Sequence, residues 1–411
     1  MKHLISLTIF LLLFGCSTKS NDTAESTQNM PETIKTDTDT NLVNQQNLDS
    51  EKFEFTTDSA YDRKLTELSS LLAGKNNINY NYFSEYSRTE TFQDYSKTFS
   101  KKWNRFDTSK LKSVKEFSNQ ELVNYESKNT IFYPFSGPDF LFVNTLLPNY
   151  SKIVMIGLEP VGTLPIIDDS DLVPDSMEAY LSSVQKSLFA ILKFSFFRTK
   201  SMKEDLRNDK VDGTIHLLLL FLNKTGCKIQ SIKPFHIDEN GNKLYLTNTV
   251  ELKKKSLSNK SIEINFIDSL NHVKQLSYTS ANLSDVSFPK NIGLQKFLNN
   301  LEIDITYLKG ASYLMHYTSF SAIRNLIMEK SKHIIQDDSG IAVKYLLNSS
   351  YKWQFNLYGL YTKPIKIFAK EYQPELDSLY QTSTVKNLGF GLGYNYRDKN
   401  SSFMIVNKIT E

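Results

Sequence analysis

Apolar residues that recur at spacings of three and four predict two helices in the first part of the folded chain. The first helix covers residues 59–73, and its apolar face consists of Leu65, Leu68 and Leu72. The second covers residues 83–105, and its apolar face is aromatic: Phe92, Tyr95, Phe99 and Trp103. An aromatic stripe at helical spacing is typical of a face that packs in a core, so we expect these rings to be buried.

A β-α-β pattern follows. Residues 130–135 form an apolar strand, residues 138–147 are helical, and residues 152–158 (KIVMIGL) form a second buried strand. The stretch FYPFSGPDF, residues 132–140, contains the turn that follows the first strand. Parallel strands joined by a helix end at one edge of a sheet, where α/β proteins tend to bind ligands.

The pattern then changes to short alternating strands. Residues 228–237 and 243–247 flank the sequence DENGN, and Asn-Gly at a turn predicts a hairpin. Residues 262–266 and 273–278 predict a second antiparallel pair. A long amphipathic helix over residues 175–197 precedes these strands, and the apolar segment 213–223 fits a helix or a strand equally well.

After Pro289 the sequence again predicts helices that alternate with strands. We expect a helix over residues 311–328, a strand over 333–336, a turn at Asp337-Asp338-Ser339-Gly340 and a strand over 354–360. The spacing from Gly137 to Gly157 is 20 residues and that from Gly340 to Gly359 is 19, which suggests a duplicated strand-SG-helix-strand unit. The alternative is chance agreement, because Ser-Gly before a helix is common capping chemistry.

These elements predict an α+β (mixed α/β) fold in which two β-α-β-like units flank an antiparallel β layer. The expected organisation along the chain has five parts: a signal over residues 1–16, a tether over 17–50, an α/β lobe over 51–227, an antiparallel layer over 228–287 and a second α/β lobe over 288–411.

The first sixteen residues predict export and lipidation. A basic start precedes an apolar run of eleven residues, which is too short for a membrane-spanning helix and suits the core of an export signal. The run ends in Leu13-Phe14-Gly15-Cys16, which resembles a bacterial lipoprotein signal with Cys16 as the lipidated residue. We therefore expect attachment to the bacterial cell envelope, at the outer membrane, through acyl chains such as palmitate. A plain secretion signal with an incidental cysteine is the alternative.

Composition separates a tether from a folded body. Residues 17–50 contain no aromatic residue and carry six acids against two lysines, so they cannot bury enough apolar surface to fold. Residues 51–411 hold 45 basic and 39 acidic residues, a mild net charge of +6. The short run Lys253–Lys255 lacks interleaved aromatic residues, and nucleic-acid binding is not expected. Cys227 is the one cysteine besides Cys16, and we interpret it as a buried thiol.

The turn over residues 136–139 can be explained by helix capping or by ligand binding. Ser136 precedes Gly137 and Pro138 and is a natural N-cap, and Asp139 lies in the first helical turn, where a carboxylate favours the helix dipole. Free amides at such a helix start can bind a polar group, but Asp139 disfavours an anion there. A polyol or a cation held by Asp139 fits better. Glu159 follows the second strand and lies at the same predicted edge.

The second turn places two adjacent carboxylates, Asp337 and Asp338, beside Ser339 at the end of a strand. If the two units face each other, these acids converge with Asp139 and Glu159. Four carboxylates suit Ca²⁺ or Mg²⁺, or an acid/base pair like that of glycoside hydrolysis. For each acid taken alone, a cap or a surface ion pair is the ordinary explanation.

Signatures of several enzyme classes are absent. The sequence contains no HExxH, no GxSxG and no GxGxxG, and GFGLG at residues 389–393 lacks the third glycine and the context of a dinucleotide site.

The stretches YPFSGPDF, GLEPVG and QDDSGI, followed by YGLY at residues 358–361, resemble a family of uncharacterised exported bacterial proteins. The likeness covers about residues 60–410, and it implies no activity and no catalytic residue. We expect a binding or structural module for a polar ligand such as a saccharide. A carboxylate-dependent hydrolase, with or without a divalent metal, is the rival hypothesis.

Overall fold

The computed structural model describes residues 60–125, 130–164, 174–188, 191–192, 211–364, 366–395 and 401–409. The chain divides into two units, Met1–Glu51 and Lys52–Glu411, and every described residue belongs to the second. The expected lipid-bearing Cys16 and the tether over residues 17–50 lie outside the described residues.

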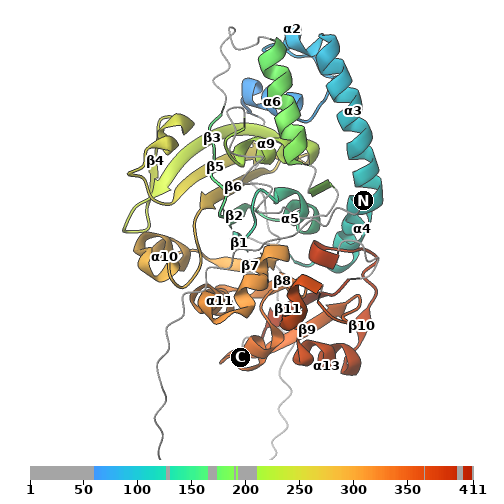
Figure 1. Ribbon diagram of the computed structural model, residues 1–411, viewed down its shortest axis with the longest axis vertical. Helices are drawn as coiled ribbons and strands as arrows, with labels where there is room; N and C mark the ends of the chain where they lie inside the picture. Colours follow the sequence, from blue (N-terminus) through green and yellow to red (C-terminus); the bar gives the residue numbers. More distant parts are fainter. Residues whose placement is uncertain are drawn as a thin grey trace, which may run out of the picture. The chain divides into compact units, whose positions relative to one another are not determined.

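The described chain begins with a run of helices and continues as a mixture of strands and helices (Figure 1). The strands are β1 (Thr130–Pro134), β2 (Lys152–Gly157), β3 (Lys228–Ile237), β4 (Lys243–Tyr245), β5 (Lys260–Ile267), β6 (Val273–Ser280), β7 (Ile303–Leu308), β8 (His333–Gln336), β9 (Trp353–Tyr358), β10 (Val385–Lys386) and β11 (Phe403–Lys408). The α-helices are α1 (Arg63–Leu72), α2 (Ser84–Ser87), α3 (Glu90–Phe106), α4 (Lys112–Glu121), α5 (Phe140–Leu146), α6 (Pro174–Ser187), α9 (Ile215–Lys224), α10 (Ile292–Asn299), α11 (Ser321–Lys330), α12 (Val343–Leu347) and α13 (Pro374–Thr382). Among the described residues, none of these helices has the length and apolar character needed to cross a membrane.

The eleven strands of the described residues form one sheet in the order β10-β9-β11-β8-β7-β1-β2-β6-β5-β3-β4. Its centre is parallel, because β1 pairs in parallel with β2 and β7, β2 with β6, and β7 with β8. Strand β11 lies antiparallel between β8 and β9. The sheet and its helices confirm the α+β class, and strands from all three expected segments of the body belong to this one sheet.

The predicted antiparallel strands are present. β3 pairs with β4 across the Asn-Gly turn, and β5 pairs with β6, as the alternating pattern indicates. β3 also pairs with β5, and β6 joins the parallel centre beside β2. The antiparallel strands therefore extend the central sheet instead of forming a separate layer.

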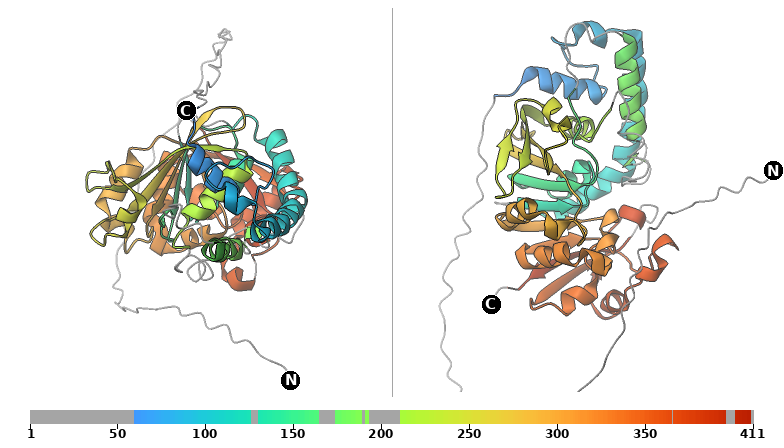
Figure 2. Two further views of the ribbon diagram at one scale, coloured as in Figure 1. Left: turned by 90° about the horizontal axis from the view of Figure 1, so that it is seen from above. Right: turned by 60° about the vertical axis from the view of Figure 1, so that its left-hand side comes forward.

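Alternate residues of the central strands supply two hydrophobic cores, one on each face of the sheet. In β1, Ile131 and Tyr133 enter one core and Phe132 enters the other. The first core also contains apolar residues of α1, α3, α5, α6 and α9, and the second contains those of α10, α11 and α12. Figure 2 shows the sheet from above with helices on both of its sides. The parallel strands are covered on both faces, as parallel sheets usually are.

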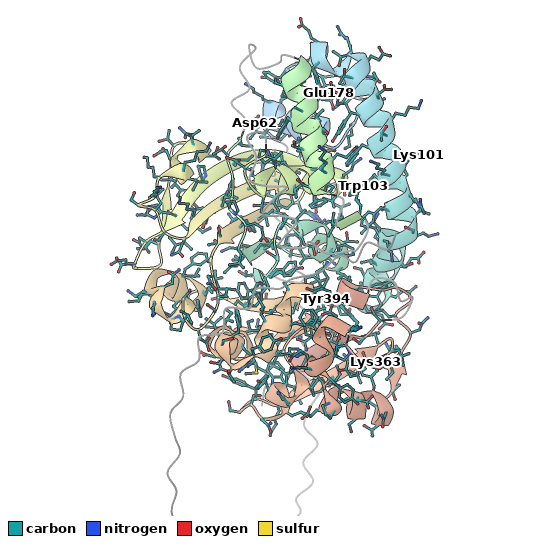
Figure 3. The ribbon with its side chains drawn as sticks, viewed as in Figure 1. Asp62, Lys101, Trp103, Glu178, Lys363 and Tyr394 are labelled. Carbon is teal, nitrogen blue, oxygen red and sulfur yellow. The ribbon has the colours of Figure 1, made fainter. Side chains whose placement is uncertain are left out.

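The aromatic stripe of α3 is buried, as its spacing predicts. Phe92 and Phe99 are fully buried and Trp103 nearly so, and their rings form a continuous row of contacts with Tyr95. Figure 3 labels Trp103 on the inner side of α3 and Lys101 on its outer side. The helix packs beside α6 (Figure 1). These rings are core residues and not an exposed ligand platform.

Local elements differ from the predictions in two places, and the structure settles one choice that the sequence left open. The expected helix over residues 311–328 is two 3₁₀ turns, Gly310–His316 and Thr318–Phe320, followed by α11. The apolar segment over 213–223 is the helix α9, which fits its nearly complete burial. The helix α3 continues through a π-helical turn, Asp107–Leu111, into α4.

The duplicated unit is not supported. β1 and β2 are neighbours, whereas β11 lies between β8 and β9. Gly137 has a positive φ of 51°, which favours glycine, and Gly340 is not among the residues with positive φ. The two Ser-Gly turns thus differ in backbone conformation and in what surrounds them, and the similar spacing is coincidental.

Candidate functional site

The carboxyl ends of five parallel strands meet at one edge of the sheet. β1 leads to Ser136–Asp139, β2 to Glu159, β6 to Ala281, β7 to Lys309, and β8 to Asp337. β2 lies on one side of β1 and β7 on the other, so the chain's connections diverge at β1. In open α/β sheets this point of divergence leaves a crevice outside the strand ends, and ligands bind there.

The turn after β1 is held by the backbone of β2. Ser136 donates its N–H to the carbonyl of Ile156 at 2.9 Å, and its hydroxyl donates to the carbonyl of Gly137 at 2.8 Å. Ser136 is therefore not the helix cap that the sequence predicts. The helix begins later, at Phe140, and the cap is Asp139, whose carboxylate accepts the N–H of Phe142 at 3.4 Å. A left-handed Gly137 and then Pro138 separate Ser136 from the helix start.

Asp139 also forms an ion pair with Lys309, the residue after β7. The side chain of Asp139 is 2% exposed and that of Lys309 is 1% exposed. The hydroxyl of Tyr133 donates to the same carboxylate at 3.0 Å, and the Lys309 ammonium lies 3.8 Å from the centre of the Phe142 ring. Burial raises the pKa of Asp139 and lowers the pKa of Lys309, while their mutual attraction opposes both shifts.

Sequence reasoning missed Lys309, although a signal for it exists. The segment IDITYL, residues 303–308, is a continuous buried strand, and Lys309-Gly310 follows it at once. A charged residue directly after a buried parallel strand is a candidate for the functional edge of the sheet.

Glu159 lies at the end of β2 and is 7% exposed. Its Oε2 atom is 2.9 Å from the position that a Cβ atom on Gly157 would occupy, and the Cα of Gly137 is 3.1 Å from that position. The Tyr278 hydroxyl donates to the Glu159 carbonyl at 2.9 Å and fixes the backbone. A side chain at residue 157 would meet the Tyr278 hydroxyl first and then the Glu159 carboxylate, so the glycine allows both groups to lie close to Gly137.

A cavity of about 90 Å³ opens between these groups. Its polar lining includes Ser136, Asp139, Glu159 and Lys309, and its apolar lining includes Phe135, Ile156, Leu158, Ala281, Leu283, Leu314 and Phe320. The volume is several times what one ordered water requires. The cavity therefore has room for a small polar group with apolar surface beside it, which is the usual composition of a ligand site.

Asp337, Asp338 and Ser339 follow β8 and do not line this cavity. The Ser339 N–H and hydroxyl both donate to the Asp337 carboxylate, and the Tyr313 hydroxyl donates to Asp338. The expected convergence of four acids is thus only half present: Asp139 and Glu159 share the cavity, and the other two acids are buried one strand beyond Lys309. Asp337 still acts electrostatically on Lys309.

The two adjacent acids after β8 have pKa values well above that of an ordinary aspartate. Burial, together with the negative charge of Asp338, raises the pKa of Asp337 to about 7. Burial raises the pKa of Asp338 to about 6, and its hydrogen bond from Tyr313 opposes that shift. At neutral pH the pair therefore holds part of a proton, as close carboxylates in an apolar setting do.

Amide side chains close the turn around these acids. Gln336 donates to the Ile341 carbonyl at 2.9 Å and accepts the Ile341 N–H at 2.8 Å, and Gln373 donates to the Asp338 carbonyl at 2.9 Å. A Cβ atom on Gly393 would lie 2.2 Å from Asp337 Oδ2, which shows how tightly the carboxylate is covered. Tyr394, labelled in Figure 3, packs beside Tyr313. This turn is a packed corner and not an open site.

The part of the chain that the structure describes contains no group of three or more His, Cys, Asp or Glu residues placed to hold a metal ion. Asp139 already accepts from a lysine, a tyrosine and a backbone amide, which leaves it poorly disposed as a cation ligand. Binding of Ca²⁺ or Mg²⁺ stays a prediction.

Comparison of the chain with protein-family models, with curated proteins and with solved structures finds no match.

Proposed function

We propose that the protein binds a small, hydroxyl-rich ligand in the cavity between β1, β2 and β7. The observation that carries this proposal is the position of that cavity, at the carboxyl edge of the parallel strands and at the point where the chain's connections diverge from β1. Its lining combines Asp139, Glu159 and Lys309 with apolar side chains.

The charge of the lining favours hydroxyl groups over an anion. Carboxylates only accept hydrogen bonds when ionised, so a ligand group that contacts Glu159 must be a donor, and a hydroxyl is one. The ammonium of Lys309 is matched by Asp139, and the start of α5 is capped by the same carboxylate. A polyol, such as a saccharide, meets these requirements without adding charge to a buried site.

The proposal includes the location. Cys16 carries the lipid, residues 17–50 are the tether, and the body is a binding module at the bacterial outer membrane.

Thermal shift and calorimetric titration with glucose, galactose, ribose, glycerol and adenosine test the proposal. We expect at least one of these compounds to raise the melting temperature of the wild type and not that of Glu159→Gln. Glu178→Gln is the matched control, because Glu178 is an exposed glutamate on α6 (Figure 3) and does not line the cavity. Equal shifts in all three proteins, or no binding by the wild type, would contradict the proposal.

A carboxylate-dependent hydrolase is the second candidate, because Asp139 and Glu159 line one cavity. Glycoside hydrolysis requires two carboxyl groups on opposite sides of a bond, one of them protonated. Burial raises the pKa of Asp139, which suits the acid, and Glu159 would be the base or nucleophile. Release of nitrophenol from nitrophenyl glycosides by the wild type, lost in Glu159→Gln, would favour this candidate over simple binding.

A further inference from the structure

A groove between α3 and α6 is separate from the cavity at the strand ends. The two helices pack side by side (Figure 1), and the groove between them has a volume of about 420 Å³. Small-molecule sites usually have volumes of roughly 300–1,000 Å³, so the groove is large enough for a ligand. None of the described residues that line the groove also lines the cavity at the ends of β1, β2 and β7.

Three carboxylates line this groove. Glu90 and Asp94 lie on α3, and Glu178, labelled in Figure 3, lies on α6. All three residues are exposed, and none of them forms an ion pair in the described part of the chain. The described lining contains no basic side chain, although Lys102 donates to Gln185 of the lining at 3.3 Å. The groove is therefore an acidic surface on a body whose net charge is positive.

Tyr86, on α2, lines the same groove with a hydroxyl that lacks a hydrogen-bond partner among the described residues. The residue is 2% exposed, and its hydroxyl is buried. Burial raises the pKa of Tyr86 to about 12, and the negative charge of Glu178 acts in the same direction, so the phenol is protonated and close to that carboxylate. Native proteins leave few buried polar groups unbonded, because each one costs free energy. A ligand group that donates to this hydroxyl would remove the cost.

The arrangement of the acids suits an extended organic cation better than a metal ion. A metal ion requires several oxygens at one point, and the described residues contain no group of three or more His, Cys, Asp or Glu placed to hold one. Glu90 and Asp94 are four residues apart, which is about 6 Å along the axis of α3, and Glu178 comes from the other helix. An ammonium group donates up to three hydrogen bonds, so separate ammonium groups can pair with separate acids.

Apolar side chains line the groove together with the acids. Tyr95 and Leu181 belong to the lining. The Tyr95 hydroxyl donates to the Leu72 carbonyl at 2.7 Å and its ring stacks on Phe99, so the ring is held in one orientation. Aromatic rings attract ammonium groups, and apolar side chains gain free energy by covering methylene groups. The groove thus offers contacts to both parts of an aliphatic polyamine.

We propose that the groove between α3 and α6 binds a linear aliphatic polyamine. One ammonium group pairs with Glu178 and donates to the Tyr86 hydroxyl, a second pairs with Glu90 or Asp94, and the methylene groups contact Tyr95. This site goes beyond the proposed function, and neither proposal depends on the other.

Isothermal titration of the chain that begins at Ser17 with putrescine, spermidine, n-butylamine and 1,4-butanediol tests the inference. We expect both polyamines to bind and 1,4-butanediol not to bind. n-Butylamine should bind roughly fivefold or more weakly than putrescine, because it forms one ion pair in place of two. Mg²⁺ carries the same charge as putrescine, and at equal ionic strength it should not displace putrescine. Added salt should weaken polyamine binding, since the acids are exposed.

Variants locate the site. Glu178→Gln should weaken putrescine binding roughly fivefold, and the double variant Glu90→Gln/Asp94→Asn should weaken it at least as much. Tyr86→Phe should weaken binding without lowering the melting temperature, because the hydroxyl has no partner to lose among the described residues. Glu116→Gln is the matched control, since Glu116 is an exposed glutamate on α4 that does not line the groove.

Four results would each overturn the inference: no binding of either polyamine by the wild type, equal affinity for n-butylamine and putrescine, displacement of putrescine by Mg²⁺, or equal weakening in Glu178→Gln and Glu116→Gln. The last result would show a response to net charge alone. Glu159→Gln should bind putrescine as the wild type does, because Glu159 lines the other cavity. Failure of polyamine binding therefore leaves the proposed function standing, and failure of saccharide binding leaves this inference standing.

Discussion

Lys309 and Asp139 form an ion pair whose side chains are at most 2% exposed, although each residue follows a different strand of the sheet. The pair joins the ends of β7 and β1 where the chain's connections diverge. Burying two charges costs several kcal/mol each, and a buried pair is seldom a net source of stability compared with apolar residues. Its position at the wall of the cavity gives it a role beyond packing.

Breaking the pair from one side should strongly destabilise the protein. Asp139→Asn leaves the Lys309 ammonium without its partner in a buried setting, and we expect a loss of about 3–5 kcal/mol in the free energy of unfolding. The double variant Asp139→Asn/Lys309→Met should recover most of that loss. Urea unfolding of four proteins, the wild type, Asp139→Asn, Lys309→Met and the double variant, measures the coupling. Lys112→Met, which removes an exposed pair with Glu116, is a control expected to change little. Additive losses in the double variant would show that the two residues do not act as a pair.

The contribution of Asp337 and Asp338 to the free energy of unfolding should fall as pH rises from about 4 to about 7. The ordinary pKa of an aspartate is 3.8, and in the folded protein the pKa of Asp337 is raised to about 7 and that of Asp338 to about 6. The folded state therefore binds protons more tightly than the unfolded state. The resulting stabilisation is complete below the unfolded pKa and is lost as pH rises through the folded values.

Asp338→Asn should remove much of that dependence. At about 1.4 kcal/mol per pKa unit, the variant should be on the order of 3 kcal/mol more stable than the wild type at pH 8 and similar to it at pH 4. Asp94→Asn, at an exposed site on α3, should change neither value. Melting curves at several pH values measure this effect. The same curves with added Ca²⁺ or Mg²⁺ test metal binding, since a cation held by these acids would stabilise the wild type alone. If the melting temperature of Asp338→Asn depended on pH in the same way as that of the wild type, the raised pKa of Asp338 would be wrong.

Cys227 should be unreactive in the native protein. The thiol is buried beside Thr225, and burial raises its pKa to about 11. In a chain that begins at Ser17, Cys227 is the sole thiol, so Ellman's reagent reports on it alone. We expect reaction on the order of a hundredfold slower in buffer than in guanidinium chloride. Equal rates in the two conditions would place the thiol at the surface.

Replacing Cys16 with Ala tests the predicted lipid anchor. The variant should no longer incorporate labelled palmitate and should leave the membrane fraction, because no other residue in the sequence resembles the acceptor of a lipoprotein signal. Retention of the label by Cys16→Ala would refute the lipoprotein interpretation.

Local patterns predicted most of the local structure. The strands expected over residues 130–135 and 152–158 occur as β1 and β2, and the Asn-Gly hairpin occurs as β3 and β4. These predictions succeed because periodicity and turn chemistry depend on neighbours in the sequence. The expected helix over 311–328 failed because Gly310–His316 follows the end of β7 as a tight 3₁₀ turn, and tertiary contacts outweigh a regular apolar pattern there.

The order of the strands could not be obtained from the sequence. The placement of β11 between β8 and β9 depends on hydrogen bonds between segments far apart in the chain, and no local pattern encodes it. For the same reason, the sequence does not predict the contact between Lys309 and Asp139. That contact forms because β7 pairs with β1 in the sheet. Asp139 and Glu159 were found because each follows a recognisable strand. Asp337 and Asp338 were assigned to the same site through a repeat that the sheet does not contain.

A crystallographic soak of the folded body with ribose, glucose, glycerol and adenosine, each in a separate crystal, tests the cavity most directly. We expect density for at least one compound between Gly137, Glu159 and Leu283, with a hydroxyl within hydrogen-bond distance of the Glu159 carboxylate and the Asp139–Lys309 pair intact. Compounds bound elsewhere, for example in the groove between α3 and α6, while the cavity holds only water at saturating concentrations, would contradict it.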